Sequence, residues 1–168
     1  EHVLILAGDH VYNMDYGEML AQHVNTKADF TVACLPVSVA DAAGQFGIME
    51  IEGNGRVRSF HEKPQNPTPI PGDPSKTLAS MGIYIANLKY LEEHLRADAH
   101  DKNSSHDFGR DIIPKVLANG DHVEAHQFLN PLEDSPPYWR DVGTIDAYYR
   151  ANLELISPEP PMDLYDPT

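Results

Sequence analysis

Apolar residues in the first part of the chain predict a strand, a helix and a second strand. Residues 2–7 are apolar after the first position, and residues 29–37 (DFTVACLPV) are rich in β-forming side chains. Short continuous apolar runs are typical of strands covered on both faces, as in parallel sheets. Between the runs, Asp15 can cap a helix, so we expect a right-handed crossover. Within this predicted helix, the residues that recur at helical spacing are Met19, Leu20, His23 and Val24.

A β-hairpin is predicted at residues 46–61. Two runs of β-forming residues, FGIMEI and RVRSFHE, flank the sequence EGNG. The pair Asn54-Gly55 inside that sequence is typical of a tight hairpin turn. We therefore expect an antiparallel hairpin inserted into the α/β pattern.

The second half of the chain again alternates strands with helices. Residues 78–86 (LASMGIYIA) and 122–128 (HVEAHQF) predict strands. Helices are expected after Asn87, within residues 107–120 and after Thr144. The apolar stripe of the last helix consists of Ile145, Tyr148, Tyr149 and Leu153. Together these elements predict an α/β fold with a mixed, mostly parallel sheet and helices on both faces.

Charge and composition narrow the possible partners. The formal net charge is −14 and the pI is about 4.8, so the chain is expected to repel nucleic acid, although local cations or a metal can still hold a small anion. No apolar run approaches the ~20 residues that span a bilayer, so no membrane association is expected. The single cysteine, Cys34, lies in an apolar run and predicts a small buried residue without a disulfide partner. A cytoplasmic location is expected.

Two aspartates are candidates for a metal site. Asp9 follows the first predicted strand, and open α/β sheets bind ligands at the carboxyl ends of their strands. A lone Gly-Asp pair is as often only a turn or a helix cap. Asp141, in YWRDVGT, also precedes a helix and lies near a glycine. Two carboxylates at one edge of a sheet are hard oxygen ligands of the kind Mg²⁺ prefers, with a phosphate completing the shell.

The Glu62-Lys63 pair is a candidate for binding a sugar phosphate. Lysine is a compact positive charge suited to a phosphate monoester, and a glutamate can accept hydrogen bonds from sugar hydroxyls. An ordinary solvated surface pair is the competing interpretation. Pro64 is expected to restrict Lys63 to extended geometry and so to direct its side chain.

Other motifs carry less chemical information. Ser80 and Gly82 lie in a predicted buried strand, where local packing explains them as well as ligand contact does. The nine histidines show no zinc spacing, and there is no Gly-x-Ser-x-Gly nucleophile motif. The sequence GNGR connects two predicted strands and opens no helix, so it is not a phosphate-binding loop.

Seven motifs in order give the chain a resemblance to the bacterial glucose-1-phosphate adenylyltransferase family, also called ADP-glucose pyrophosphorylase. The motifs are ILAGDHVYNMDY, TVACLPV, FGIMEI, FHEKP, DPSKTLASMGIY, NSSHDFGRDIIP and PYWRDVGTIDAYYRANLEL. NSSHDFGRDIIP and DPSKTLASMGIY favour this family over related enzymes that make UDP- or dTDP-sugars. The resemblance implies part of a Rossmann-like nucleotide-diphospho-sugar transferase fold. It also implies transfer of the adenylyl group of ATP to α-D-glucose 1-phosphate for glycogen synthesis.

Residue roles follow from the resemblance at the matching positions. Asp9 is expected to be catalytic and, with Asp141, to bind Mg²⁺. Lys63 is expected to hold the sugar phosphate and Glu62 the sugar hydroxyls. Gly47 and Ser80 are expected to line the glucose 1-phosphate pocket, Gly47 on the strength of the resemblance alone.

The resemblance also implies how the chain relates to a longer protein. Residues 1–156 are expected to be the later, C-terminal part of the catalytic domain, and residues 157–168 a linker toward a β-helix domain. The family's glycine-rich, arginine-bearing triphosphate loop is expected to precede residue 1, so the chain by itself is expected to be inactive. The full-length parent is expected to be an allosteric homotetramer.

Three alternatives remain open. One is a non-catalytic, regulatory sugar-phosphate-binding subunit of the same fold, which the presence of both Asp9 and Asp141 disfavours. Another is a different sugar-1-phosphate nucleotidyltransferase. The third is a metal-dependent glycosyltransferase, which usually carries an Asp-x-Asp motif that AGDH does not match.

Overall fold

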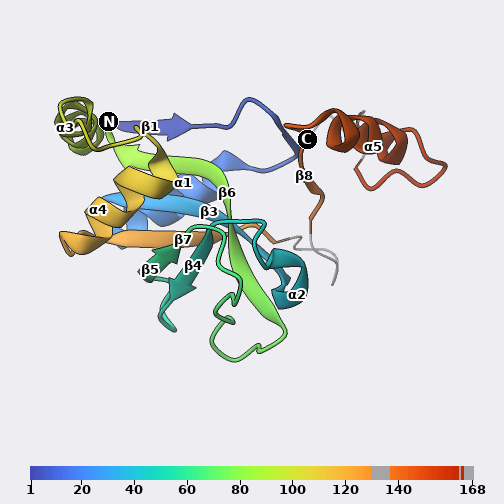
Figure 1. The fold of residues 1–168 in the computed structure, drawn as a ribbon, viewed down its shortest axis with the longest axis horizontal. Helices are drawn as coiled ribbons and strands as arrows, with labels where there is room; N and C mark the ends of the chain where they lie inside the picture. The colour runs from blue at the N-terminus through green and yellow to red at the C-terminus, as the bar shows by residue number, and fades with distance from the viewer. Residues whose placement is uncertain (130–136, 163, 165–168) are drawn as a thin grey trace.

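The computed structural model describes residues 1–129, 137–162 and 164. One six-stranded sheet has the order β5-β4-β6-β3-β7, with β1 also pairing with β6, and β2 and β8 form a separate two-stranded ladder (Figure 1). The strands are β1 (His2–Ile5), β2 (His10–Tyr12), β3 (Phe30–Ser38), β4 (Ile48–Ile51), β5 (Val57–His61), β6 (Lys76–Asn87), β7 (Val123–Gln127) and β8 (Trp139–Asp141). The helices are α1 (Tyr16–Thr26), α2 (Val39–Ala42), α3 (Leu88–Ala99), the π-helical turn η1 (Phe108–Ile112), α4 (Ile113–Ala118) and α5 (Ile145–Leu155).

The long strand β6 organises the main sheet. One of its edges pairs antiparallel with β3, and its other edge pairs antiparallel with β4 and, further along, with β1. Strand β7 pairs parallel with β3, so the mixed α/β sheet is confirmed. The expected crossover is modified, because β1 and β3 run in the same direction but β6 lies between them. The hydrogen-bonded pairs among the described strands are mainly antiparallel. The sequence did not indicate this, because the burial pattern of a strand shows that it is covered but does not identify its neighbours.

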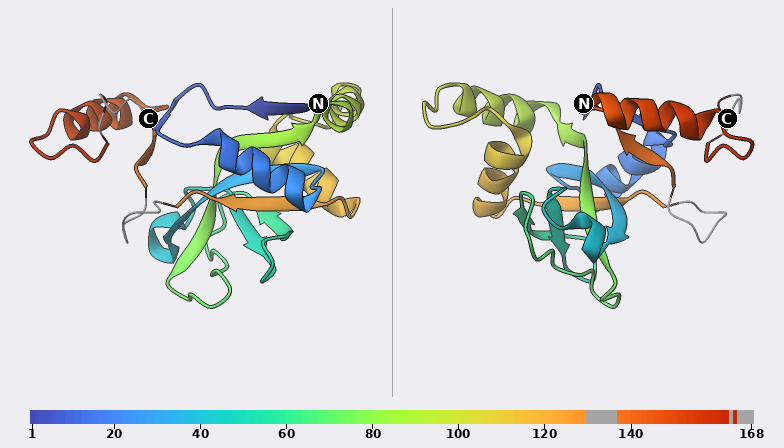
Figure 2. Two further views of the ribbon diagram at one scale, coloured as in Figure 1. Left: turned by 180° about the vertical axis from the view of Figure 1, so that it is seen from behind. Right: turned by 45° about the vertical axis from the view of Figure 1, so that its right-hand side comes forward.

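Helices cover both faces of the sheet, as predicted (Figure 2). Alternate residues of β3 point to opposite faces because the side-chain period of a strand is two. Phe30 and Val32 pack with residues of α3, η1 and α4 on one face, and Ala33 and Leu35 pack with Met19 of α1 on the other. The sheet is thus the central layer between two helical layers.

Helix and hairpin ends largely follow the sequence signals. Asp15 accepts a hydrogen bond from the Gly17 N–H at the start of α1, and Thr144 does the same for the Ala147 N–H at the start of α5. Strands β4 and β5 form the predicted hairpin. Asn87 precedes α3 but donates its side-chain amide to the Ala28 carbonyl, so a tertiary contact replaces the expected cap.

The histidine on the predicted apolar side of α1 is a buried core residue. His23 has an exposed fraction of 1%, and its Nδ1 lies 2.7 Å from the Thr31 hydroxyl on β3. Burial, together with the nearby His2, lowers the pKa of His23 to about 4. His23 is therefore neutral near pH 7, which explains how a titratable residue occupies an apolar stripe.

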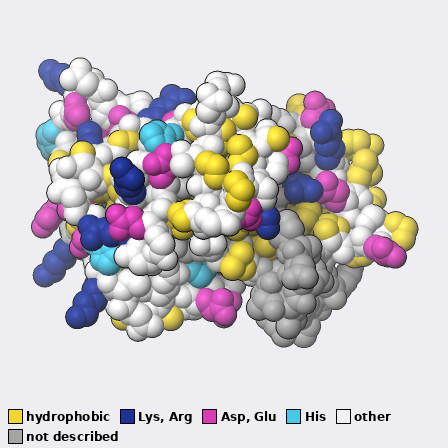
Figure 3. Space-filling view, turned by 90° about the horizontal axis from the view of Figure 1, so that it is seen from below, with side chains coloured by type: hydrophobic (Ala, Val, Ile, Leu, Met, Phe, Trp, Pro, Cys, Tyr) yellow, Lys and Arg dark blue, Asp and Glu magenta, His cyan; other side chains and the backbone are white. Residues whose placement is uncertain are grey.

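Helix α5 differs from the expectation for an amphipathic helix. Its predicted stripe is exposed, with exposed fractions of 88% for Ile145 and 60% for Tyr148. The helix stands apart from the sheet and packs against β8, and apolar side chains gather on the surface at this end of the molecule (Figure 3). Helical periodicity correctly identified the apolar residues that share one face of α5. It did not indicate that this face is exposed.

Two composition-based expectations can be compared with the described residues. Cys34 is fully buried, and burial raises the pKa of its thiol, so it is an unreactive core residue. Within residues 1–129, 137–162 and 164, no helix combines the length and apolar character required to span a bilayer. Residues 163 and 165–168 of the expected linker lie outside the described part of the chain, and the domain boundary stays a prediction.

Candidate active site

A cleft of about 540 Å³ opens at one side of the sheet. Its walls come from the end of β1, the start of β2, residues 45–47, the end of β5 with the two residues that follow it, the middle of β6, residues 106–109 and β8. The volume lies within the range of small-molecule sites. Among the residues predicted from the sequence, the cleft is lined by Gly47, Glu62, Lys63, Ser80 and Asp141.

Gly47 and Ser80 are joined directly through their backbones. The Ser80 N–H donates to the Gly47 carbonyl at 2.8 Å, which fixes the 45–47 segment beside β6. A Cβ at position 47 would lie 2.6 Å from two ring carbons of Phe60 and 3.1 Å from Oε2 of Glu62. The same carboxylate oxygen lies 3.3 Å from the Cβ position of Gly109. Two glycines therefore allow the Glu62 carboxylate to lie between two backbone segments.

Replacing Gly47 with alanine is expected to destabilise the chain by about 1–3 kcal/mol, because the new methyl group overlaps the Phe60 ring. The matched control is Gly53→Ala in the same hairpin, where nothing lies within 4 Å of the added Cβ. Urea unfolding of both variants measures the difference. Equal stabilities of Gly47→Ala and Gly53→Ala would contradict the close approach of Phe60.

Lys63 lies in the cleft with a backbone conformation opposite to the expected one. Its φ is 46°, in the left-handed region, although a residue before proline favours extended geometry. Hydrogen bonds on both sides hold it there, from the Lys63 N–H to the Phe46 carbonyl at 3.1 Å and from the Gly44 N–H to the Pro64 carbonyl at 2.9 Å. The prediction that Pro64 makes Lys63 extended was wrong, because these tertiary contacts outweigh the local preference. Such strained residues concentrate at functional sites.

Asp9 and Asp141 meet where β2 pairs with β8. Asp9 lies in the turn between β1 and β2 rather than at the end of a strand, and Asp141 ends β8. The Val142 N–H donates to the Asp9 carbonyl at 2.8 Å, which ties the two segments together. Oδ2 of Asp9 and Oδ1 of Asp141 each lie 3.1 Å from the Cβ position of Gly143. The structure thus brings together two carboxylates that are 132 positions apart.

This carboxylate pair fits a magnesium ion shared with a phosphate ligand. Mg²⁺ prefers oxygen ligands and is usually held by one or two carboxylates together with substrate phosphates and water. Among the described residues, no group of three or more His, Cys, Asp or Glu side chains is arranged to hold a metal ion. Two carboxylates would leave the rest of the coordination shell of such an ion to ligand and water oxygens.

His10 lies beside the carboxylate pair and also lines the cleft. Its Nε2 lies 3.8 Å from Oδ1 of Asp9, and its ring packs edge-on against Trp139 with centroids 5.1 Å apart. Its Nδ1 is buried and has no hydrogen-bond partner among the described residues, as is also true of Nε1 of Trp139. The sequence assigned no role to His10, and the structure places it in the wall of the cleft.

Several further wall residues were missed by the sequence interpretation. Tyr84 of β6 is buried, and burial raises its pKa to about 12, so its hydroxyl stays protonated near pH 7. The segment 106–109 and Trp139 complete the wall. NSSHDFG entered the sequence interpretation only through the family resemblance, and YWRD otherwise only through Asp141. The close spacing of polar and aromatic residues in these motifs was the available signal for a binding surface.

Comparisons with known proteins find relatives along nearly the whole chain. The family model described as nucleotidyl transferase matches residues 1–157. A glucose-1-phosphate adenylyltransferase of Yersinia pseudotuberculosis is 53% identical over 170 residues, and glucose-1-phosphate adenylyltransferase 2 of Pseudoalteromonas atlantica is 50% identical over 167 residues. A Teredinibacter turnerae glucose-1-phosphate adenylyltransferase is 50% identical over 166 residues. Each alignment covers 99% of this chain and 39% of the relative, so the chain spans about two fifths of the length of these relatives.

Proposed function

Because the chain belongs to the nucleotidyl transferase family, we propose that it carries the sugar-phosphate and metal side of an adenylyltransferase site. The reaction is transfer of the adenylyl group of ATP to α-D-glucose 1-phosphate, giving ADP-glucose and pyrophosphate. The curated relatives, which carry this substrate in their names, support that choice. The proposal includes a cytoplasmic location and homotetrameric assembly of the longer protein.

One observation carries the proposal. The cleft places a lysine and a glutamate, Lys63 and Glu62, in the same space as the carboxylate of Asp141. A sugar phosphate needs a cation for its phosphate and hydrogen-bond acceptors for its hydroxyls, and the cleft offers both. The proposal assigns the meeting point of this ligand and a second phosphate-bearing substrate to the Asp9–Asp141 pair.

The chemistry requires positioning and charge compensation. A phosphate oxygen of glucose 1-phosphate forms a bond to the α-phosphorus of ATP, while the bond from that phosphorus to the leaving pyrophosphate breaks. No proton transfer is needed to balance this exchange. Lys63 can donate hydrogen bonds to the attacking phosphate and so reduce the repulsion between two anions. Glu62 can accept hydrogen bonds from the sugar and hold it in line.

A magnesium ion held by Asp9 and Asp141 would supply positive charge to the reacting phosphates. The chain's own contribution there is to fix the two carboxylates, through the β2–β8 pairing and the hydrogen bond from the Gly143 N–H to Oδ1 of Asp141 at 2.8 Å. Both aspartate side chains remain accessible, since Asp9 and Asp141 are exposed. The carboxylates are thus held in place while leaving room for ligands.

Calorimetric titration tests the proposal in this chain. We expect saturable binding of glucose 1-phosphate in the presence of Mg²⁺ and at least tenfold weaker binding of glucose 6-phosphate. Little or no ADP-glucose formation is expected from the chain alone, because residues 53–56 join β4 to β5 and supply no phosphate-binding loop at a helix start. Equal affinity for both sugar phosphates, or no binding of either, would overturn the proposed function.

A non-catalytic sugar-phosphate-binding subunit is the competing function. This alternative predicts that the chain binds glucose 1-phosphate in the same way. It also predicts that the function does not depend on the carboxylates of Asp9 and Asp141. The longer protein that contains these residues should form ADP-glucose from ATP and should prefer ATP to UTP and dTTP. Binding without turnover in that protein would favour the regulatory subunit.

A further inference from the structure

One wall of the cleft is formed by a segment without regular secondary structure. Residues 100–107 connect α3 to η1, and His106 and Asp107 from this segment line the cleft. A second pocket of about 230 Å³ shares His106 and Phe108 with the cleft. The His106 side chain is 57% exposed, so apolar packing contributes little and polar contacts hold this part of the wall in place.

Asp98, near the end of α3, is the centre of those contacts. Its side chain is only 5% exposed. Oδ1 accepts hydrogen bonds from the Lys115 ammonium at 2.8 Å and from the Ser104 hydroxyl at 2.7 Å, and Oδ2 lies 2.9 Å from Nδ1 of His106. These contacts, with Lys115 contributing most, hold the pKa of Asp98 well below its ordinary value. A buried carboxylate with this many donors is paired and ionised.

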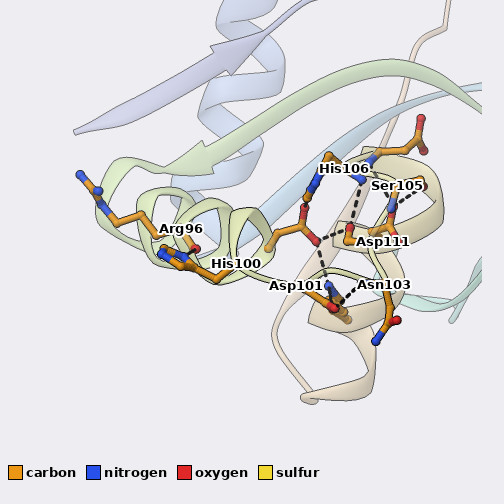
Figure 4. A network of polar contacts seen from close by, with 11 residues as sticks. Arg96, His100, Asp101, Asn103, Ser105, His106 and Asp111 are labelled. Carbon is orange, nitrogen blue, oxygen red and sulfur yellow. Dashed lines mark hydrogen bonds and ion pairs between the residues drawn. The ribbon is translucent and has the colours of Figure 1, made fainter.

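The contacts continue from Asp98 into the backbone of the wall. The Ser104 hydroxyl that donates to Asp98 also accepts from the His106 N–H at 3.0 Å. His106 is thus fixed twice, and its φ of 60° lies in the left-handed region, which a residue with a side chain keeps only when its surroundings determine it. Asp111 accepts hydrogen bonds from the N–H groups of Ser105 and Asp107, each at 3.1 Å (Figure 4). Asp98 and Ser104 thus hold His106, and Asp111 separately holds the neighbouring Asp107.

We propose that Asp98 is a positioning residue for the sugar-phosphate cleft: through Ser104 and His106 it holds the 104–107 wall in the geometry that binds the ligand. The inference rests on the proposed function, because it assigns a role in the same cleft. Asp98 does not touch the ligand. It reaches the cleft only through the residues it holds.

Loss of this support has a specific energetic consequence. A wall that is loose before binding must be ordered at the moment of binding, and fixing a backbone residue has a substantial entropic cost. The ligand then binds more weakly, but once bound it meets the same reacting groups. We therefore expect an effect on Kd and KM for glucose 1-phosphate and little effect on kcat.

Asp98→Ala tests the inference, with Glu92→Gln as the matched control. Glu92 is an acidic residue on the same helix whose exposed pair with Arg96 does not reach the cleft. We expect Asp98→Ala to raise the Kd of the chain for glucose 1-phosphate about tenfold and to speed hydrogen exchange in residues 104–111, whereas Glu92→Gln changes neither. In the longer protein, KM for glucose 1-phosphate should rise about tenfold while kcat and KM for ATP change less than twofold.

Ser104→Ala provides a milder variant if Asp98→Ala does not fold. It removes only the hydroxyl that links Asp98 to the His106 N–H, and we expect a Kd increase of about threefold.

If the wild type binds and a folded variant binds with unchanged Kd, the positioning role is overturned while the proposed function stands. If the wild type does not bind glucose 1-phosphate, the proposed function is overturned. Hydrogen exchange then decides separately whether Asp98 orders the wall, and unchanged exchange overturns that role too.

Discussion

Replacing Asp9 or Asp141 with asparagine is expected to lower kcat of the longer protein by about 10³-fold, with a smaller effect on KM for glucose 1-phosphate. Each substitution keeps the size of the side chain and removes one negative charge from the pair beside Gly143. Charge compensation by a bound metal is worth several kcal/mol in the transition state, and each ~1.4 kcal/mol changes a rate tenfold. Initial rates of ADP-glucose formation over a series of Mg²⁺ concentrations measure the effect.

Asp146→Asn is the matched control for these two substitutions. Asp146 lies in the first turn of α5, only five positions from Asp141, and its side chain is exposed. This control separates the loss of a site carboxylate from a general change in negative charge. Variants of Asp9 and Asp141 that keep full turnover at low Mg²⁺ would show that the pair does not hold the metal. Binding of glucose 1-phosphate that survives in variants without turnover would support the enzyme over the regulatory subunit.

Lys63→Met is expected to raise the Kd for glucose 1-phosphate about 10- to 100-fold. Methionine keeps most of the aliphatic side chain and removes the charge, and a hydrogen bond to a charged group contributes about 1.5–3 kcal/mol. Lys63 lines the cleft together with Glu62 and Ser80. Titration calorimetry at two salt concentrations measures the change, because a charge-based contact at an accessible site weakens as salt rises.

Lys89→Met is the control for the charge change. Lys89 is an exposed residue on α3, outside the cleft. It should leave both the Kd and its salt dependence unchanged. Lys63→Arg is not expected to restore full affinity, because the planar guanidinium is larger and presents its donors differently from a compact ammonium. An unchanged Kd in Lys63→Met would remove Lys63 from the phosphate site.

Part of the fold was predictable because the signals are local. Asp15 and Thr144 cap their helices with short side chains, and Gly55 adopts a φ of 92° in the β4–β5 hairpin, as Asn-Gly sequences favour. The neighbours of each strand were not predictable in the same way. β6 lies between β1 and β3, and no periodicity within a single strand identifies its neighbour.

The same distinction between local signals and tertiary contacts applies to the candidate site. Asp9, Asp141, Glu62 and Lys63 could be selected from the sequence because carboxylates and a lysine in a strand-end context predict metal and phosphate binding. The same reasoning failed for the backbone of Lys63, where hydrogen bonds with Phe46 and Gly44 outweigh the preference imposed by Pro64. It also missed Asp98, whose role depends on residues 6, 8 and 17 positions further along the chain.

The sequence by itself determined the types of elements, their approximate ends and the chemical groups available, because periodicity, caps and side-chain chemistry act over a few residues. Only the tertiary structure decided that β2 and β8 bring Asp9 beside Asp141, and that a buried carboxylate on α3 contacts His106 in the wall of the cleft. It also decided that the apolar stripe of α5 is exposed. These outcomes depend on which distant segments meet, and that is set by the packing of the whole chain.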